Sequence, residues 1–99
     1  MEQRYCVYVI ELSDRAGRRV DPDLACVYVG QTVRTPEERF YQHRTGKKAS
    51  RWVRKYGIRL RPDLYEHLNP ITDRDAAEQC EKDLATTLAE KGYRVFGGH

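Results

Sequence analysis

The fold of this chain is decided by two short stretches, YCVYVIEL at residues 5–12 and CVYVG at residues 26–30. Both are rich in β-branched and aromatic residues, which is the composition of buried strands. The segment between them, residues 13–22, is polar and contains Gly17, as is typical of a long hairpin connection. We therefore expect two strands that pair antiparallel to one another.

A helix is predicted directly after the second strand by its start and stop residues. Thr35 can cap the helix, Pro36 suits the first helical position, and Glu38 lies three residues after the cap, which completes a capping box. The helix is expected to run to about Arg44 and to stop near Gly46.

A second, short helix is predicted because apolar residues recur at i, i+3, i+4 and i+7 and form one stripe. This stripe consists of Ala49, Trp52, Val53 and Tyr56, and Gly57 ends the helix. Off the stripe lies a group of basic residues, namely Lys47, Lys48, Arg51, Arg54 and Lys55.

The last third of the chain predicts a weak strand and a long helix. Residues 64–68 are the third expected strand, and the final helix is capped by Thr72 or Asp73, reaches about Lys91 and ends at Gly92. The order β-β-α-α-β-α predicts an α+β fold with a small three-stranded, mainly antiparallel sheet flanked by helices. Residues 1–99 are expected to form a single domain.

The composition favours a folded domain without a membrane span. Hydrophobic residues make up 39% of the chain, enough to offset the ordering entropy that keeps polar chains disordered. No apolar run approaches the roughly 20 residues needed to cross a bilayer, and residues 1–4 contain no apolar stretch of a signal peptide. A cytoplasmic location is expected. The widely spaced Cys6, Cys26 and Cys80 fit neither a disulfide framework nor a zinc site, so buried thiols are expected.

Charge is distributed unevenly, although the net charge of the whole chain is only +3. Residues 34–61 carry ten basic groups and two acidic ones, whereas the segments on either side carry a small excess of acidic groups. A basic middle in an otherwise acidic chain suggests a local footprint for a polyanion. A solvated helix face would give the same pattern, so charge alone leaves both interpretations open.

Two pairs of side chains are candidates for chemistry. Tyr8 and Tyr28 lie one on each apolar strand and could aim their hydroxyls at one spot, or could be ordinary core residues. Arg39 and His43 are four residues apart on one helix and therefore about 40° apart around its axis. An arginine fork suits phosphate oxygens and a histidine transfers protons near neutral pH, but an exposed pair on a solvated helix has the same spacing.

A third candidate is Glu81 on the final helix, where the apolar stripe is formed by Ala77, Cys80, Leu84 and Leu88. Glu81 lies about 60° from Leu84, at the edge of this stripe, whereas Glu78 lies about 120° away, towards solvent. A carboxylate pressed against a core is costly unless it is paired or binds a cation. Glu81 is therefore the better ligand candidate, although an edge glutamate can also extend into solvent.

Taken in order, these residues resemble the GIY-YIG nuclease superfamily. Cys6-Val7-Tyr8 and Tyr28-Val29-Gly30 are similar to the two tripeptides that name it, and Arg39-x-x-x-His43 and Glu81 look like its remaining motifs. The resemblance covers essentially the whole chain. It implies a metal-dependent endonuclease that hydrolyses phosphodiester bonds in nucleic acid, with DNA favoured over RNA.

The resemblance also implies a role for each matching residue. Tyr8 would activate the attacking water, Tyr28 would orient water or phosphate, and Gly30 would let the backbone approach the substrate. Arg39 would stabilise charge on the scissile phosphate, and His43 would donate a proton or contact phosphate.

The implied cofactor is one divalent cation, Mg²⁺ or Mn²⁺, with Glu81 as its only protein ligand, since Mg²⁺ keeps several waters. Phosphate contacts are expected from the basic group, which positions nucleic acid without reading its sequence. The chain contains no sequence-reading motif, so structure-selective or single-strand cleavage is expected, and a protein partner could supply targeting.

This chain departs from the family pattern at several positions. Cys6 stands in place of the first glycine, the spacing from Gly30 to Arg39 is one residue longer than in many members, and Arg94 stands where many carry an asparagine. Two other functions stay open. One is a catalytically decayed GIY-YIG-like nucleic-acid-binding module, and the other is a protein-interaction domain that docks a partner through the helix containing Trp52.

Overall fold

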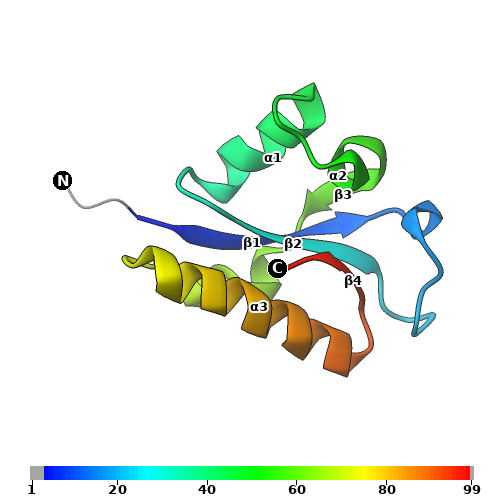
Figure 1. Ribbon diagram of the computed structural model, residues 1–99. Helices are drawn as coiled ribbons and strands as arrows, with labels where there is room; N and C mark the ends of the chain where they lie inside the picture. The colour runs from blue at the N-terminus through cyan, green and yellow to red at the C-terminus, as the bar shows by residue number, and fades with distance from the viewer. Residues whose placement is uncertain (1–3, 99) are drawn as a thin grey trace.

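The computed structural model describes residues 4–98, which form a four-stranded sheet with α-helices on both sides (Figure 1). Residues 1–3 lie outside this range. They belong to the N-terminal segment in which the sequence predicts no signal peptide. The strands are β1 (Cys6–Leu12), β2 (Cys26–Thr32), β3 (Gly57–Leu60) and β4 (Arg94–Gly97). The α-helices are α1 (Pro36–Thr45), α2 (Arg51–Tyr56) and α3 (Arg74–Lys91), and single 3₁₀ turns occupy η1 (Asp14–Ala16), η2 (Pro62–Leu64) and η3 (Glu66–Leu68).

The sheet has the strand order β3-β1-β2-β4. Strands β1 and β2 pair antiparallel, as predicted, with Tyr8 opposite Gly30 and Ile10 opposite Tyr28. Strand β3 adds antiparallel to the outer edge of β1, and β4 adds parallel to β2. The sheet is therefore mixed, because the chain crosses over through α3 before it returns as β4.

The predicted third strand at residues 64–68 is wrong. That segment consists of the turns η2 and η3, and the strand lies earlier, at Gly57–Leu60. Pro62 starts η2 and has no N–H to donate to a strand ladder. A fourth strand at Arg94–Gly97 was also missed, because four residues after a helix are too few to show a period.

The helix boundaries agree well with the sequence. Thr35 accepts a hydrogen bond from the backbone N–H of Glu38, and Gly46 ends α1 in the left-handed conformation with φ of 87°. Asp73, not Thr72, caps α3, and Gly92 ends it with φ of 110°. None of the helices within residues 4–98 is long and apolar enough to cross a membrane.

The core lies on both faces of the two central strands. Helices α1 and α2 lie on one side of the sheet, and α3 crosses the other side (Figure 1). The three cysteines are free thiols, but only Cys26 is fully buried, whereas Cys6 and Cys80 are half-buried. The expectation of three buried thiols therefore holds for one of them.

Strand β3 pairs with only part of the outer edge of β1, and at Val7 a side chain takes the place of a strand. The carboxamide of Asn69 accepts a hydrogen bond from the N–H of Val7 at 2.9 Å and donates one to the carbonyl of Val7 at 2.8 Å. Just before this point Tyr5 forms an isolated bridge with Ile71. One side chain thus occupies both backbone groups of a strand residue.

Candidate active site

The two tyrosines lie on one face of the sheet because of the register of β1 and β2. Tyr8 is opposite Gly30 and Tyr28 is opposite Ile10, so the two rings are diagonal neighbours, with centroids 6.4 Å apart. Tyr8 is only 2% exposed and Tyr28 is half-buried. The two tyrosines therefore lie side by side on one face of the sheet, as the expectation of a shared site requires.

Gly30 provides the space that the Tyr8 side chain occupies. A Cβ atom added at Gly30 would lie 2.5 Å from the hydroxyl oxygen of Tyr8 and 2.6 Å from its Cζ atom. Only glycine fits beneath this ring. The geometry thus supplies a reason for the glycine that differs from the expected approach of backbone to substrate.

His43 is a buried partner of Tyr8. The imidazole is 1% exposed and its Nε2 atom lies 2.9 Å from the Tyr8 hydroxyl. Its Nδ1 atom accepts a hydrogen bond from the backbone N–H of Ser50 at 3.0 Å. Because an accepting nitrogen carries no proton, the neutral ring must be protonated on Nε2 and donate to Tyr8. Burial and the charge of Arg39 lower the pKa of His43 to about 4, so the ring is neutral at pH 7.

Arg39 is held by the loop after α1. Its guanidinium donates to the carbonyl of Lys48 at 2.9 Å and to that of Lys47 at 3.4 Å. Its positive charge also acts on Tyr8, where it opposes the rise of the pKa that burial causes. The loop carbonyls therefore hold the guanidinium in place, and its charge acts on both tyrosines.

Glu81 is buried, not at the edge of the apolar stripe. The residue is only 6% exposed, and the buried face of α3 consists of Ala77, Glu81, Leu84 and Leu88. These positions follow a helical repeat of i, i+4, i+7 and i+11. The stripe expected from the sequence ran through the half-buried Cys80, because a glutamate was counted as polar. Glu78, by contrast, pairs with Arg74 at 3.4 Å on the surface.

The electrostatics bring Glu81 into the same group as the tyrosines. Its negative charge acts on both Tyr8 and Tyr28, and so does the positive charge of Arg39. Burial and Tyr28 raise the pKa of Tyr8 far above its ordinary value of 10, despite Arg39. Burial also raises the pKa of Tyr28, against a side-chain hydrogen bond with Ser50 that lowers it. Both tyrosines are therefore neutral phenols at pH 7.

The carboxylate of Glu81 fits a cation that needs few protein ligands. Among residues 4–98 no group of three His, Cys, Asp or Glu side chains is arranged to hold a metal ion. A cage of protein ligands is therefore lacking in this part of the chain. Mg²⁺ is often held by one or two carboxylates, with water and phosphate completing its shell, so one buried glutamate suffices.

The basic group lies on α2 and the loop before it. Lys47, Lys48, Arg51, Arg54 and Lys55 are all exposed. The guanidinium of Arg51 lies 4.9 Å from the ring centre of Trp52, and the ammonium of Lys55 lies 5.4 Å from that of Tyr56. The aromatic side chains of the helix thus support cations that remain accessible to a polyanion.

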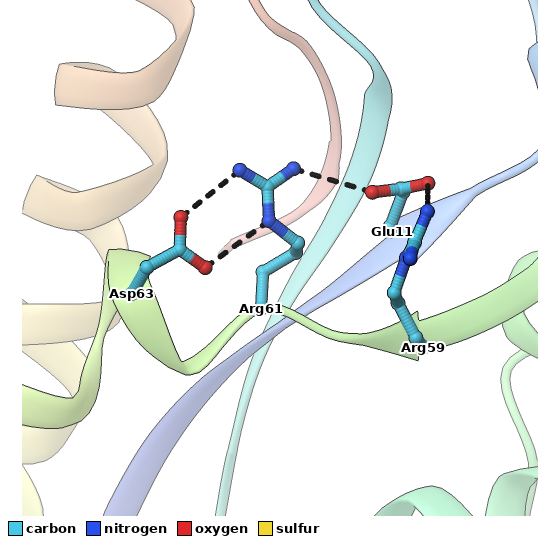
Figure 2. Close-up of polar contacts among 4 residues, drawn as sticks. All are labelled: Glu11, Arg59, Arg61 and Asp63. Atoms are coloured by element: carbon cyan, nitrogen blue, oxygen red, sulfur yellow. Dashed lines mark hydrogen bonds and ion pairs between the residues drawn. The ribbon is translucent and has the colours of Figure 1, made fainter.

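Two arginines at the end of the basic segment, Arg59 and Arg61, are paired with acidic residues. Figure 2 shows Glu11 between Arg59 and Arg61, with oxygen-to-nitrogen distances of 3.1 and 3.3 Å. Arg61 also forms a two-pronged contact with Asp63, at 3.1 and 3.0 Å. These two arginines join β1 to β3 and the following turn. The charge excess in the sequence therefore overstates the surface available to phosphate.

Sequence reasoning missed Ser50, whose backbone N–H donates to His43, the hydrogen-bond partner of Tyr8. The Ser50 hydroxyl caps α2 by accepting from the N–H of Trp52 at 3.2 Å. A serine before a helix is a recognisable cap, but nothing in the sequence connects it with His43. Trp52, the expected docking residue, packs on Phe96 with ring centres 4.6 Å apart and so joins α2 to β4.

The grouping of two tyrosines, an arginine and a buried glutamate beside an exposed basic helix is suited to an anionic substrate. A family model described as the GIY-YIG catalytic domain matches residues 4–94, nearly the whole chain. The chain belongs to the GIY-YIG family, which implies a nuclease-type function on nucleic acid, typically with a divalent cation. No curated protein and no solved structure matches the chain.

Proposed function

We propose that this domain is an endonuclease that hydrolyses phosphodiester bonds in DNA and depends on Mg²⁺ or Mn²⁺. The observation that carries the proposal is the contact of Tyr8, Tyr28 and His43 on one face of the sheet. The charges of Arg39 and of the buried Glu81 act on both tyrosines. Hydrolysis of a phosphodiester needs an activated water, neutralised phosphate oxygens and a stabilised leaving oxygen.

Tyr8 is the proposed acceptor of the proton from the attacking water. To accept a proton it must first become a phenolate, which its burial opposes. The N–H of His43 and the charge of Arg39 both favour the phenolate. A divalent cation held by Glu81 would add positive charge that favours deprotonated oxygens nearby and neutralises the phosphate.

His43 acts through Tyr8 in this proposal. Its ring is buried and both of its nitrogens have partners within the domain, so a direct contact with phosphate is less well supported than a role in positioning. Arg39 supplies the donor fork for the phosphate oxygens on which charge develops. Tyr28 is half-buried and orients water or phosphate with its hydroxyl.

The exposed basic group on α2 and its preceding loop holds the nucleic-acid backbone. Backbone contacts position a substrate but do not specify its sequence, so we propose cleavage that depends on DNA structure or on single strands. Targeting by a partner protein is consistent with this lack of sequence reading.

A decayed nucleic-acid-binding module is the alternative. It is favoured by Arg94, which stands at the position of a family asparagine and extends over the ring of Phe96, with its guanidinium 5.5 Å from the ring centre. In that position it stabilises β4 and makes none of the contacts of a carboxamide. The module would keep the basic surface and bind DNA without cutting it.

The test is incubation with single-stranded, duplex and branched DNA, with and without Mg²⁺ or Mn²⁺. Tyr8→Phe and Arg39→Ala should each lower kcat by about 100-fold, the usual effect of losing one preorganised donor. The double variant should lose little more, because groups of one site act together. Tyr41→Phe and Arg44→Ala, exposed neighbours on α1, are the matched controls. Salt-sensitive binding without metal-dependent cleavage would favour the decayed module.

A further inference from the structure

A pocket of about 520 Å³ lies where the starts of β1 and α1 meet the turns η2 and η3. Its volume is within the range of ligand-binding pockets. The lining includes Cys6, Tyr65, two glutamates and three prolines. None of the proposed catalytic residues and none of the basic group on α2 lines it. The pocket is therefore not part of the site described above.

The hydroxyl of Tyr65 is buried at this pocket without a hydrogen-bond partner. The residue is 3% exposed, and within residues 4–98 no group forms a hydrogen bond with its oxygen. A buried hydroxyl without a partner costs stability, because it has given up its hydrogen bonds to water. Burial, together with the charges of Glu37 and Glu66, raises the pKa of Tyr65 to about 12. Both glutamates line the pocket, so the hydroxyl end of Tyr65 is on the pocket side of the ring.

The carboxylates of Glu37 and Glu66 give the pocket its charge. Both residues are exposed, and the ion pairs in the described part of the chain include neither of them. No basic residue lines the pocket. Two carboxylates accept hydrogen bonds, and the phenol oxygen of Tyr65 can accept one as well. The pocket is therefore complementary to a cation that carries several hydrogen-bond donors.

The spacing of these groups favours a guanidinium over a metal ion. Cys6, Glu37 and Glu66 line the same pocket, but no three His, Cys, Asp or Glu side chains within residues 4–98 are arranged to hold a metal. These three are therefore too far apart to share one ion. A guanidinium has five N–H donors in a planar fork and can reach acceptors that are more widely spread. Its apolar stem can pack against the prolines.

We propose that this pocket binds an arginine side chain of a protein partner, with Glu37 and Glu66 as its anionic contacts and the Tyr65 oxygen as a further acceptor. The Tyr65 oxygen is covered in the free domain, so side chains of the pocket wall must shift when an N–H of the ligand reaches it. The carboxylates repel phosphate, so nucleic acid is excluded as the occupant. A partner bound here would leave the basic group on α2 free for DNA.

The binding test uses a short peptide with one arginine between two glycines, blocked at both ends. Titrated into the full chain, it should shift the ¹⁵N NMR signals of Cys6, Glu37 and Glu66 in a saturable way. A citrulline peptide has the same shape without the charge and should bind at least about tenfold more weakly. Glu37→Gln and Glu66→Gln should each raise the Kd by up to about fivefold, as for one exposed ion pair. Glu90→Gln, an exposed glutamate on α3, is the matched control and should bind like the wild type.

The second test separates a ligand-binding hydroxyl from a structural one. Tyr65→Phe removes the unsatisfied group, so the Tm of the free chain should rise by about 4–8 °C. The same variant should bind the arginine peptide about fivefold more weakly, the effect of one hydrogen bond. A lower Tm or an unchanged Kd in Tyr65→Phe would overturn the proposal. Equal binding of the arginine and citrulline peptides, or no binding of either, would do the same. Neither test involves cleavage, so the result is independent of the proposed nuclease function.

Discussion

Replacement of Gly30 by alanine should disable the site without removing any functional group. An added methyl group would lie 2.5 Å from the Tyr8 oxygen and 2.6 Å from Cζ, whereas ordinary contact begins at 3.4 Å. The Tyr8 oxygen must therefore move by about 0.9 Å. Its 2.9 Å hydrogen bond with His43 cannot survive such a shift in most directions.

The expected loss follows from the size of this displacement. Misplacing a catalytic group by about 1 Å costs on the order of 100-fold in rate, so kcat of Gly30→Ala should fall by about that factor. Forcing a methyl group into a packed region costs about 1–3 kcal/mol of stability. The variant should therefore be folded but inactive, and cleavage of a labelled DNA substrate under saturating conditions measures the effect.

The control separates loss of stability from displacement of Tyr8. Gly46 has φ of 87°, and a Cβ added there would meet its nearest atom at 3.5 Å, so Gly46→Ala costs about 1–2 kcal/mol in backbone strain alone. It should retain kcat. If Gly30→Ala cut DNA within twofold of the wild-type rate, the role given to the Tyr8 position would be refuted.

Three further outcomes are expected. Glu81→Gln should abolish metal-dependent cleavage, whereas Glu78→Gln should cut normally; equal activities measured over a Mg²⁺ titration would remove Glu81 from the site. Replacing Lys47, Lys48, Arg51 and Arg54 with Gln should weaken binding and flatten its salt dependence, by about 0.9 in the slope of log K against log salt for each duplex phosphate that the variant no longer neutralises. A wild-type slope in that variant would place DNA elsewhere. The pKa of His43 is 6.5 in the unfolded chain and about 4 in the folded protein. Because the unfolded chain therefore binds the proton first, the free energy of unfolding should fall by about 3 kcal/mol as the pH drops from 6.5 to 4. In denaturant titrations His43→Gln should lack this part of the decline, and an equal decline in both proteins would mean that His43 is accessible to protons.

Local patterns in the sequence predicted the elements that carry most of the site. The strands with Tyr8 and Tyr28, the cap at Thr35 and the glycine ends of the long helices depend on composition and spacing over a few residues. Those features are visible in one sequence. The antiparallel pairing of the first two strands also followed, because the polar connection between them has no helical pattern of the kind that a parallel crossover usually contains.

Features that depend on long-range contacts were not predictable. Strand β4 becomes a strand only because β2 offers a parallel partner to four residues. The burial of Glu81 depends on how α3 lies against the sheet, and its charge hides it from a hydrophobic pattern. The protonation state of His43 depends on one backbone N–H from another segment, seven residues away. No spacing rule contains that information.

The carboxamide of Asn69 has a consequence for self-association. An unpaired strand edge is a template on which another chain can add, and edge pairing is a common start of aggregation. The amide is the side-chain group that most closely imitates a peptide unit, and at Val7 it fills the place that a neighbouring strand would take. Aspartate at this position has the same shape but no donor. Conversion of that one nitrogen to oxygen would leave the carbonyl of Val7 without its donor and would open the edge at this residue, between the pairings that Tyr5 and Val9 keep.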